Sequence, residues 1–203
     1  MKVRFILFPV LAVVILGVGA AAAVQWADRN YQYQGSSFEP FPEAYDFTLQ
    51  DSQGGEFRMA EQRGKVVLLF FGYANCPDVC PTTLAEFKRI REELGEQADQ
   101  VAFVFVTVDP ERDTPELIDR YVHAFNPTFI GLSGSEEELQ PVWDGYFVAR
   151  GKVETESAVG YLMEHSSRVY VVDKQGRLRL TFPFGMEVEA MTEDVLHLLK
   201  EQG

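Results

Sequence analysis

The sequence predicts an α/β fold in which a central mixed β-sheet is flanked by helices. Residues 66–73 and 101–108 are apolar at nearly every position, as in strands that are covered on both faces. Amphipathic stretches with helical spacing follow each of these strands along the chain. Strands that alternate with helices in this way predict a largely parallel sheet with helices on both faces.

The N-terminal residues 1–26 are interpreted as a single-pass membrane anchor or a signal segment. Lys2 and Arg4 precede residues 5–26, a run without any charge that is long enough to cross a bilayer as a helix. The basic flank predicts that the N-terminus stays inside and that the rest of the chain lies outside. The small residues at 20–23 suit cleavage of a signal peptide, whereas the length of the run favours a retained anchor. Either alternative places the folded part in the bacterial periplasm, at the inner membrane, or in an equivalent extracytoplasmic space.

Residues 27–43 are polar and contain prolines, which predicts a linker, and residues 44–203 are expected to form the folded domain. Residues 46–58 alternate around a glycine-containing turn and predict a β-hairpin. No element is expected in the polar stretch 149–159. Further strands are expected at 129–132, 168–173 and 177–182, and helices at 82–97, 114–125, 135–147 and 187–201.

Local signals support the helices in that list. In the helix expected at 82–97, apolar residues recur at spacings of three and four, and Gly95 suits its C-terminal end. Thr114 is expected to cap the next helix, with Pro115 at its first position. A serine followed by three glutamates begins the helix expected at 135–147.

The two cysteines of the chain, Cys76 and Cys80, lie between the first buried strand and the helix after it. Unpaired N–H groups at a helix N-terminus stabilise a thiolate and lower its pKa. A disulfide is feasible, because Cα atoms one helical turn apart lie about 6 Å from each other. Such a bond closes a very short loop and stabilises the fold little. The pair is therefore expected to exchange electrons, attack a substrate or bind a metal.

His165 is the candidate third donor. The other two histidines, His123 and His197, are expected at the surfaces of their helices, whereas His165 is expected in a loop just before the strand at 168–173. A CxxxC motif at the end of the first long strand places the chain near the thioredoxin-like architecture. Thioredoxins carry a cis-proline beside the redox loop at the entrance of the late strand. This sequence has no proline there, so His165 can occupy that position.

Three motifs together resemble the Sco/SenC family. They are CPDVCP at 76–81 after the buried strand, VDPERDTPE at 108–116, and a single histidine before a late strand. The resemblance covers roughly residues 40–200. Members of this family are membrane-anchored, thioredoxin-fold copper proteins that help to build the copper centre of cytochrome c oxidase.

The resemblance implies that copper is bound by Cys76, Cys80 and His165. It also implies, as partner, the oxidase subunit that receives copper, with other copper chaperones or thiol reductants as further candidates. The sequence departs from the family pattern at Ala74 and at Glu164. Neither change removes a ligand, but Glu164 can alter the groups that orient the imidazole.

Coordination chemistry agrees with copper. Thiolates select Cu(I), and imidazole together with thiolates also accepts Cu(II). A three-ligand zinc site would be open and catalytic, yet the sequence places no general base nearby. Met163 is expected to pack in the core rather than to bind the metal weakly. Asp78 is expected to cap the helix, with recognition by a partner as the alternative, and Asp109 to lie at the rim of the site.

Alternative functions remain open. Cys76 and Cys80 can act as the redox-active pair of a thiol–disulfide oxidoreductase that keeps the cysteines of the oxidase copper subunit reduced. Because such exchange needs no histidine, His165 favours a copper metallochaperone. A thiol peroxidase is disfavoured because threonines follow Cys80 instead of preceding it. A formal net charge of −13 argues against a nucleic-acid partner and is compatible with steering of a basic protein.

Overall fold

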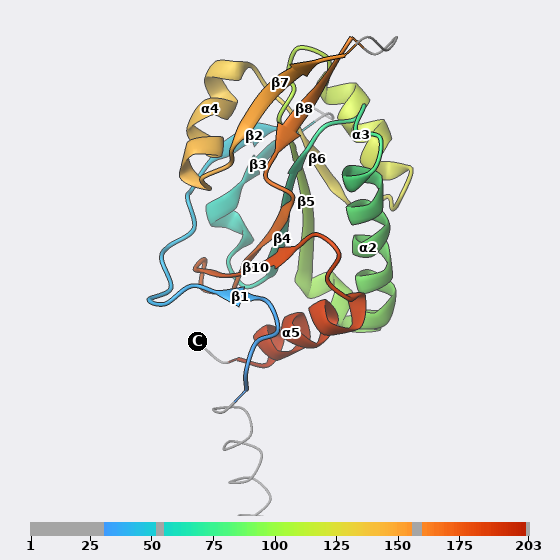
Figure 1. The fold of residues 1–203 in the computed structure, drawn as a ribbon. Coiled ribbons are helices and arrows are strands. Elements are labelled where there is room, and N and C mark those ends of the chain that lie inside the picture. Colours follow the sequence, from blue (N-terminus) through green and yellow to red (C-terminus); the bar gives the residue numbers. More distant parts are fainter. Residues whose placement is uncertain (1–30, 52–54, 156–159, 202–203) are drawn as a thin grey trace, which may run out of the picture. The chain divides into compact units, whose positions relative to one another are not determined.

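The structure, a computed structural model, describes residues 31–51, 55–155 and 160–201 (Figure 1). The chain divides into two units, Met1–Tyr33 and Gln34–Gly203. In the described part of the first unit, the rings of Tyr31 and Tyr33 pack edge to face with centroids 5.2 Å apart. The expected membrane segment, residues 1–26, lies outside the described residues. Within the described ranges, no helix has the length and apolar character needed to cross a membrane.

A six-stranded mixed sheet forms the centre of the second unit, with strand order β1-β10-β9-β4-β5-β6. Strands β4, β5 and β6 are parallel, whereas β9 is antiparallel to β4 and β10 is antiparallel to β9. All seven residues of β4 and all seven of β5 are buried, as the unbroken apolar runs predict. The strands are β1 (Ser36–Ser37), β4 (Val66–Gly72), β5 (Val101–Thr107), β6 (Ile130–Leu132), β9 (Arg168–Val172) and β10 (Leu178–Pro183).

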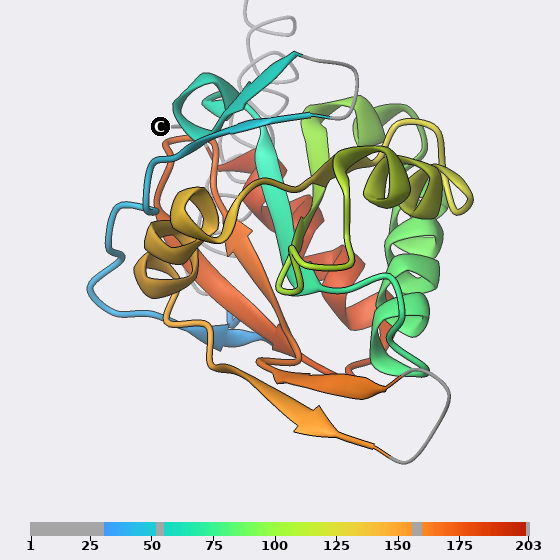
Figure 2. The same ribbon diagram turned by 90° about the horizontal axis from the view of Figure 1, so that it is seen from above.

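Helices cover both faces of this sheet, and Figure 2 shows α2 and α4 on opposite sides of it. Phe87 of α2 packs on Phe103, and Tyr121 of α3 packs on Phe105. Phe103 and Phe105 are two residues apart in β5 and face the same way, so α2 and α3 share one face. Helix α5 packs against α2 on that face. The helices are α2 (Val79–Leu94), α3 (Pro115–His123), α4 (Glu136–Gly145) and α5 (Val188–Lys200), with short 3-10 turns η1 (Met59–Gln62) and η2 (Gly95–Gln100).

The opposite face is covered by α4 and by a small hairpin. Tyr146, just after α4, packs on Phe71 of β4 with ring centroids 5.5 Å apart. Phe47, next to the hairpin strand β2 (Thr48–Gln50), packs on the same tyrosine. Strand β2 pairs with β3 (Glu56–Arg58) in a separate two-stranded sheet, which confirms the expected hairpin.

The predicted central mixed sheet with flanking helices is confirmed, but several local expectations are wrong. The polar stretch after α4 forms β7 (Arg150–Glu154), which pairs antiparallel with β8 (Tyr161–His165). In addition, residues 36–37, which lie in the expected linker, form β1 and pair with β10. His197 is buried, with 8% of its surface exposed, although it was expected at the surface.

Candidate metal centre

The cysteine segment begins where β4 ends, at Gly72. A Cβ atom at this position would lie 2.7 Å from the Sγ atom of Cys80 and 2.9 Å from the ring of Phe105. Contacts this short would force the sulfur or the ring to move. Glycine is therefore required here so that the first turn of α2 can lie against the end of the strand.

Helix α2 begins three residues earlier than expected, so Cys80 lies in its first turn. Asp78 occupies the N-cap position, but its side chain makes no capping hydrogen bond, contrary to the expectation. Instead, the Sγ atom of Cys76 accepts the backbone N–H of Cys80 at 3.4 Å. The sulfur of Cys76 thus takes the role of the cap and benefits from the positive end of the helix.

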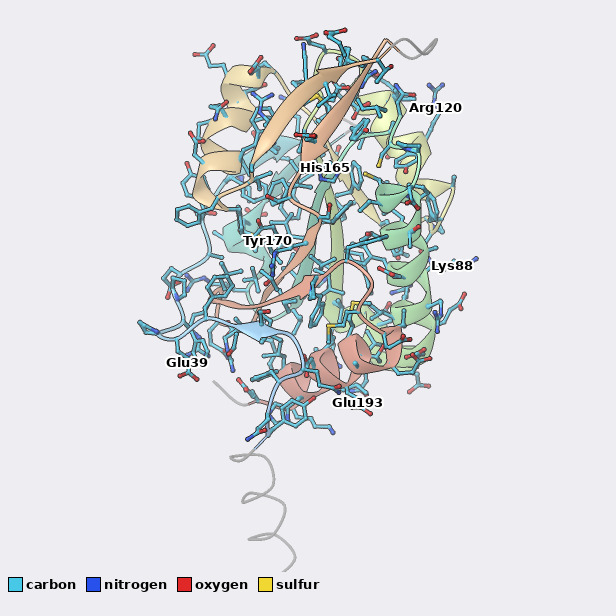
Figure 3. All side chains as sticks on the ribbon, viewed as in Figure 1. Glu39, Lys88, Arg120, His165, Tyr170 and Glu193 are labelled. Carbon is cyan, nitrogen blue, oxygen red and sulfur yellow. The ribbon has the colours of Figure 1, made fainter. Side chains whose placement is uncertain are left out.

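His165 is the last residue of β8, and not a loop residue as expected. Figure 3 labels its side chain, at the end of β8. Its Nε2 atom lies 3.7 Å from the Sγ atom of Cys80, and its Nδ1 atom lies 3.2 Å from the backbone oxygen of Ser166. Because a carbonyl oxygen only accepts, Nδ1 carries the proton and the lone pair of Nε2 faces the sulfur. Glu164 is exposed, so a backbone carbonyl, and not that carboxylate, orients the imidazole.

The structure brings Cys76, Cys80 and His165 together, with their ligand atoms within 4.8 Å of one another. Ligands that bind one ion at roughly 2.0–2.3 Å lie at most about 4.6 Å apart, so a small contraction suffices for shared binding. Cys80 is buried, whereas Cys76 and His165 are partly exposed. Two sulfurs and one imidazole nitrogen form a donor set that fits copper in either of its common oxidation states.

The two thiols differ strongly in acidity. The pKa of Cys76 is lowered to about 4, first because the Cys80 thiol donates a hydrogen bond to its thiolate, and further because the backbone N–H groups of Asp78 and Cys80 donate to it. Burial raises the pKa of Cys80 well above its ordinary value, and the neighbouring Cys76 raises it further. The pair therefore holds one proton at neutral pH, with the negative charge on the more exposed sulfur.

A buried carboxyl group supports the cysteine segment. Asp113 accepts the backbone N–H of Ala74 at 3.1 Å and the hydroxyl of Thr107 at 2.6 Å. Burial raises the pKa of Asp113 to about 6. The hydrogen bond to Ala74 fixes the backbone two residues before Cys76.

An open groove of about 370 Å³ gives solvent access to Cys76 and His165. Two acidic residues, Asp78 and Glu164, also line it. Its apolar lining comes from both sides of the site, namely from Tyr73, Pro77, Val79, Val153, Leu162 and Met163.

Other residues singled out in the sequence lie outside the cluster. His123 is partly buried and lies 3.1 Å from the backbone oxygen of Phe129. Met163 is 5% exposed, in agreement with a packing role. Asp109 is not at an open rim but 1% exposed, and it contacts Arg112 and Tyr161. Sequence reasoning missed these two partners, although the VDPERD motif marked the segment that holds them.

Comparison with known proteins gives consistent matches. The family model SCO1/SenC matches residues 37–200. The SCO2-like protein RP587 of Rickettsia prowazekii is 35% identical over 157 residues, which cover 77% of this chain and 75% of the relative. The structure of Bradyrhizobium japonicum ScoI with copper bound is 37% identical with a TM-score of 0.71, covering 77% of this chain and 99% of that one. Apo Sco1 from Thermus thermophilus is 39% identical with a TM-score of 0.75, covering 84% and 99%.

Proposed function

This chain belongs to the SCO1/SenC family, and from that premise we propose that it binds one copper ion through Cys76, Cys80 and His165. The proposal includes delivery of that copper to the copper-receiving subunit of cytochrome c oxidase. The observation that carries it is the convergence of two sulfurs and the Nε2 atom of His165 within 4.8 Å. The copper bound to the Bradyrhizobium relative supports the same cargo.

Each residue has a distinct task in the proposed binding. Cys76, already a thiolate at neutral pH, is the first ligand that an incoming ion meets, because it is the more exposed sulfur. Cys80 must release its proton to become the second ligand, so copper uptake releases a proton. His165 offers a neutral nitrogen, a donor that stabilises Cu(II) more than Cu(I).

The proposal also places the folded domain outside the cytoplasm, held at the membrane by residues 1–26. Its support is the uncharged run with a basic flank and the membrane anchoring that the family resemblance implies. The net charge of −13 suits an encounter with a basic surface on the receiving protein.

Metal analysis of the full-length chain and of a His165→Ala variant tests the copper site. We expect one copper per wild-type chain and a Cu(II) affinity at least about 100-fold lower in the variant. This loss exceeds the roughly 10- to 100-fold loss that follows when a residue that only hydrogen-bonds to a metal ligand is removed. Cu(I) affinity should fall much less, because both thiolates remain. His123→Ala, which removes a histidine outside the cluster, is the matched control. Unchanged Cu(II) binding in His165→Ala would show that the site is wrongly assigned.

A second candidate function is thiol–disulfide exchange, which the lowered pKa of Cys76 favours. The thiolate of Cys76 would attack a substrate disulfide, form a mixed disulfide and release one substrate thiolate. Cys80, after losing its proton, would then attack the Cys76 sulfur and release the second thiolate. Two electrons pass to the substrate, and a thiol reductant must later reduce the Cys76–Cys80 disulfide.

The two functions can be separated with two variants. Cys80→Ser should trap a mixed disulfide with an oxidised substrate peptide if exchange occurs, detectable as a mass adduct at Cys76. His165→Ala should retain exchange while losing Cu(II). Absence of an adduct in Cys80→Ser, under conditions where Cys76 reacts with an alkylating agent, would exclude the reductase role.

A further inference from the structure

The loop 109–113, which follows β5, contacts both of the segments that carry the three candidate ligands. We propose that this loop is a strut that sets the position of His165 relative to the cysteines, with Arg112 and Tyr161 as positioning residues. The inference rests on the proposed copper function and deepens it.

His165 needs such support because its hairpin lies outside the main sheet. Among the described strands, β7 and β8 pair with each other and with no strand of the six-stranded sheet. Figure 1 shows this hairpin projecting beyond the end of the sheet, next to the start of α2. The pairing of the main sheet holds the chain only from Ser167 onward, where Phe184 donates its N–H to the Ser167 oxygen, so side-chain contacts are needed to hold the far end of β8.

The first half of the strut joins the loop to the start of β8. The Tyr161 hydroxyl donates to Oδ1 of Asp109 at 2.7 Å, and Arg112 donates to the Tyr161 backbone oxygen at 2.9 Å. The Arg112 guanidinium also lies over the Tyr161 ring, 3.6 Å from its centroid, and its Nε atom pairs with Asp109 at 2.5 Å. Asp109 is 1% exposed, and a buried ion pair with this many directional bonds favours one geometry.

The second half joins the same loop to the cysteine segment. Asp113, four residues after Asp109, holds the backbone N–H of Ala74. Between the two halves lies the ring of Tyr73, which is 5.8 Å from the Arg112 guanidinium and 5.8 Å from the His165 ring. The loop thus contacts the segment before Cys76 and the strand that ends at His165.

Other contacts of the hairpin are more exposed or lie on its other strand. Lys152 pairs with Glu111, but both side chains are substantially exposed, so this ion pair contributes little. The guanidinium carbon of Arg150 in β7 lies 3.8 Å from the ring centroid of Trp143 in α4, so this contact holds the other strand of the hairpin. The contacts of Tyr161 act on the start of β8, four residues or about 13 Å from His165, whereas the rings of Phe70 and Tyr73 contact His165 itself.

Loss of the contacts between the loop 109–113 and Tyr161 should change the affinities for Cu(I) and Cu(II) by different amounts. Two thiolates suffice to bind Cu(I) tightly, whereas the affinity for Cu(II) depends more on the imidazole ligand. A displaced His165 therefore lowers Cu(II) affinity selectively, whereas a general loss of stability lowers the affinity for both ions.

The test compares Tyr161→Phe and Arg112→Lys with wild type in the full-length chain. Tyr161→Phe removes the hydroxyl bond to Asp109 and keeps the aromatic ring. Arg112→Lys keeps the positive charge but loses the planar guanidinium, which donates to Asp109 and to the Tyr161 backbone oxygen at the same time. Tyr146→Phe is the matched control, because it removes a tyrosine hydroxyl bond of 3.0 Å to the Tyr45 backbone, a bond that involves no residue of β8 or of the loop 109–113. We expect about 10-fold weaker Cu(II) binding in both strut variants, with Cu(I) affinity within about threefold of wild type. The electron paramagnetic resonance spectrum of Cu(II) should change, and amide hydrogen exchange in β8 should become faster.

Three outcomes would be decisive against the strut or against its premise. Wild-type Cu(II) affinity in both strut variants, with His165→Ala impaired, would overturn the strut and leave the copper site intact. Unchanged Cu(II) affinity in His165→Ala as well would overturn the copper site itself. Equal losses for Cu(I) and Cu(II), matched by Tyr146→Phe, would show a general loss of stability and also overturn the strut.

Discussion

Cys76 and Cys80 lie one helical turn apart, yet their surroundings favour opposite protonation states. The sulfur of Cys76 is partly exposed and accepts hydrogen bonds from the Cys80 thiol and from the helix N-terminus. The sulfur of Cys80 lies against Gly72 and has no access to water. Because the anion is stabilised at one position and desolvated at the other, we expect Cys76 to be the residue that attacks a disulfide or first contacts a metal ion.

This difference predicts the pH profile of alkylation. Iodoacetamide should modify Cys76 with a midpoint near pH 4 and a rate that is constant above about pH 6, since the thiolate is the reactive form. Cys80 should remain unmodified in the folded chain. Mass spectrometry of peptides after timed quenching measures both sites.

The chain unfolded in guanidinium is the control for this profile. In the unfolded chain, the alkylation rate of both cysteines should have its midpoint at about pH 8.5, the ordinary pKa of a thiol. A midpoint near 8.5 for Cys76 in the folded chain would contradict the proposed charge distribution.

At this scale the sequence identified the residues but not their surroundings. Cys76, Cys80 and His165 could be selected because thiols at a helix start and an isolated late histidine are unusual local signals. The contacts of Arg112 with Tyr161 join residues 49 positions apart. No local pattern encodes such a pair, so it could be found only in the folded structure.

Among the elements, buried strands were the easiest to predict and exposed strands the hardest. The apolar runs of β4 and β5 indicate burial on both faces, and both strands appear where expected. In β7 no residue is fully buried, so its sequence lacks the alternation that marks a half-buried strand. The missed β7 explains why His165, which pairs with Arg150, was expected in a loop.

Asp113 links the end of β5 to the cysteine segment and should give stability a distinctive pH dependence. Burial raises the pKa of its carboxyl group from 3.8 to about 6 in the folded state. The folded state then binds this proton more tightly than the unfolded state, so protonation stabilises the fold. The contribution is complete below about pH 4 and is lost as pH rises through about 6, a change of about 3 kcal/mol.

Urea unfolding of wild type and Asp113→Asn between pH 4 and pH 7 measures this effect. The free energy of unfolding of wild type, relative to the variant, should fall by about 2–3 kcal/mol over this range. An asparagine oxygen can still accept from Ala74 and Thr107, so the fold should persist. Asp99→Asn, at an 85% exposed side chain, controls for the loss of one negative charge. Parallel stability curves for wild type and Asp113→Asn would contradict the burial argument.

At the scale of the whole molecule, the chain enters its second unit far from the candidate metal centre. The carboxylate of Asp194 in α5 is fully buried and accepts the backbone N–H groups of Gln34 and Gly35. Figure 1 shows α5 and β1 at one end of the sheet and the β7-β8 hairpin at the other. The attachment point and the open groove therefore do not compete for the same surface of this unit.

The proposed anchor makes a prediction about the intact chain in a bacterial host. If residues 1–26 are retained, the chain should keep its full mass, stay in the membrane fraction after washing with alkaline carbonate, and be digested by protease added to spheroplasts. A variant without residues 1–26 should remain in the cytoplasm and resist that protease. A shortened chain that starts after residue 23 and is released with the periplasmic contents would show a cleaved signal peptide instead. Protection of the full-length chain from protease in intact spheroplasts would contradict both alternatives, because each places the two thiols and His165 outside the cytoplasm.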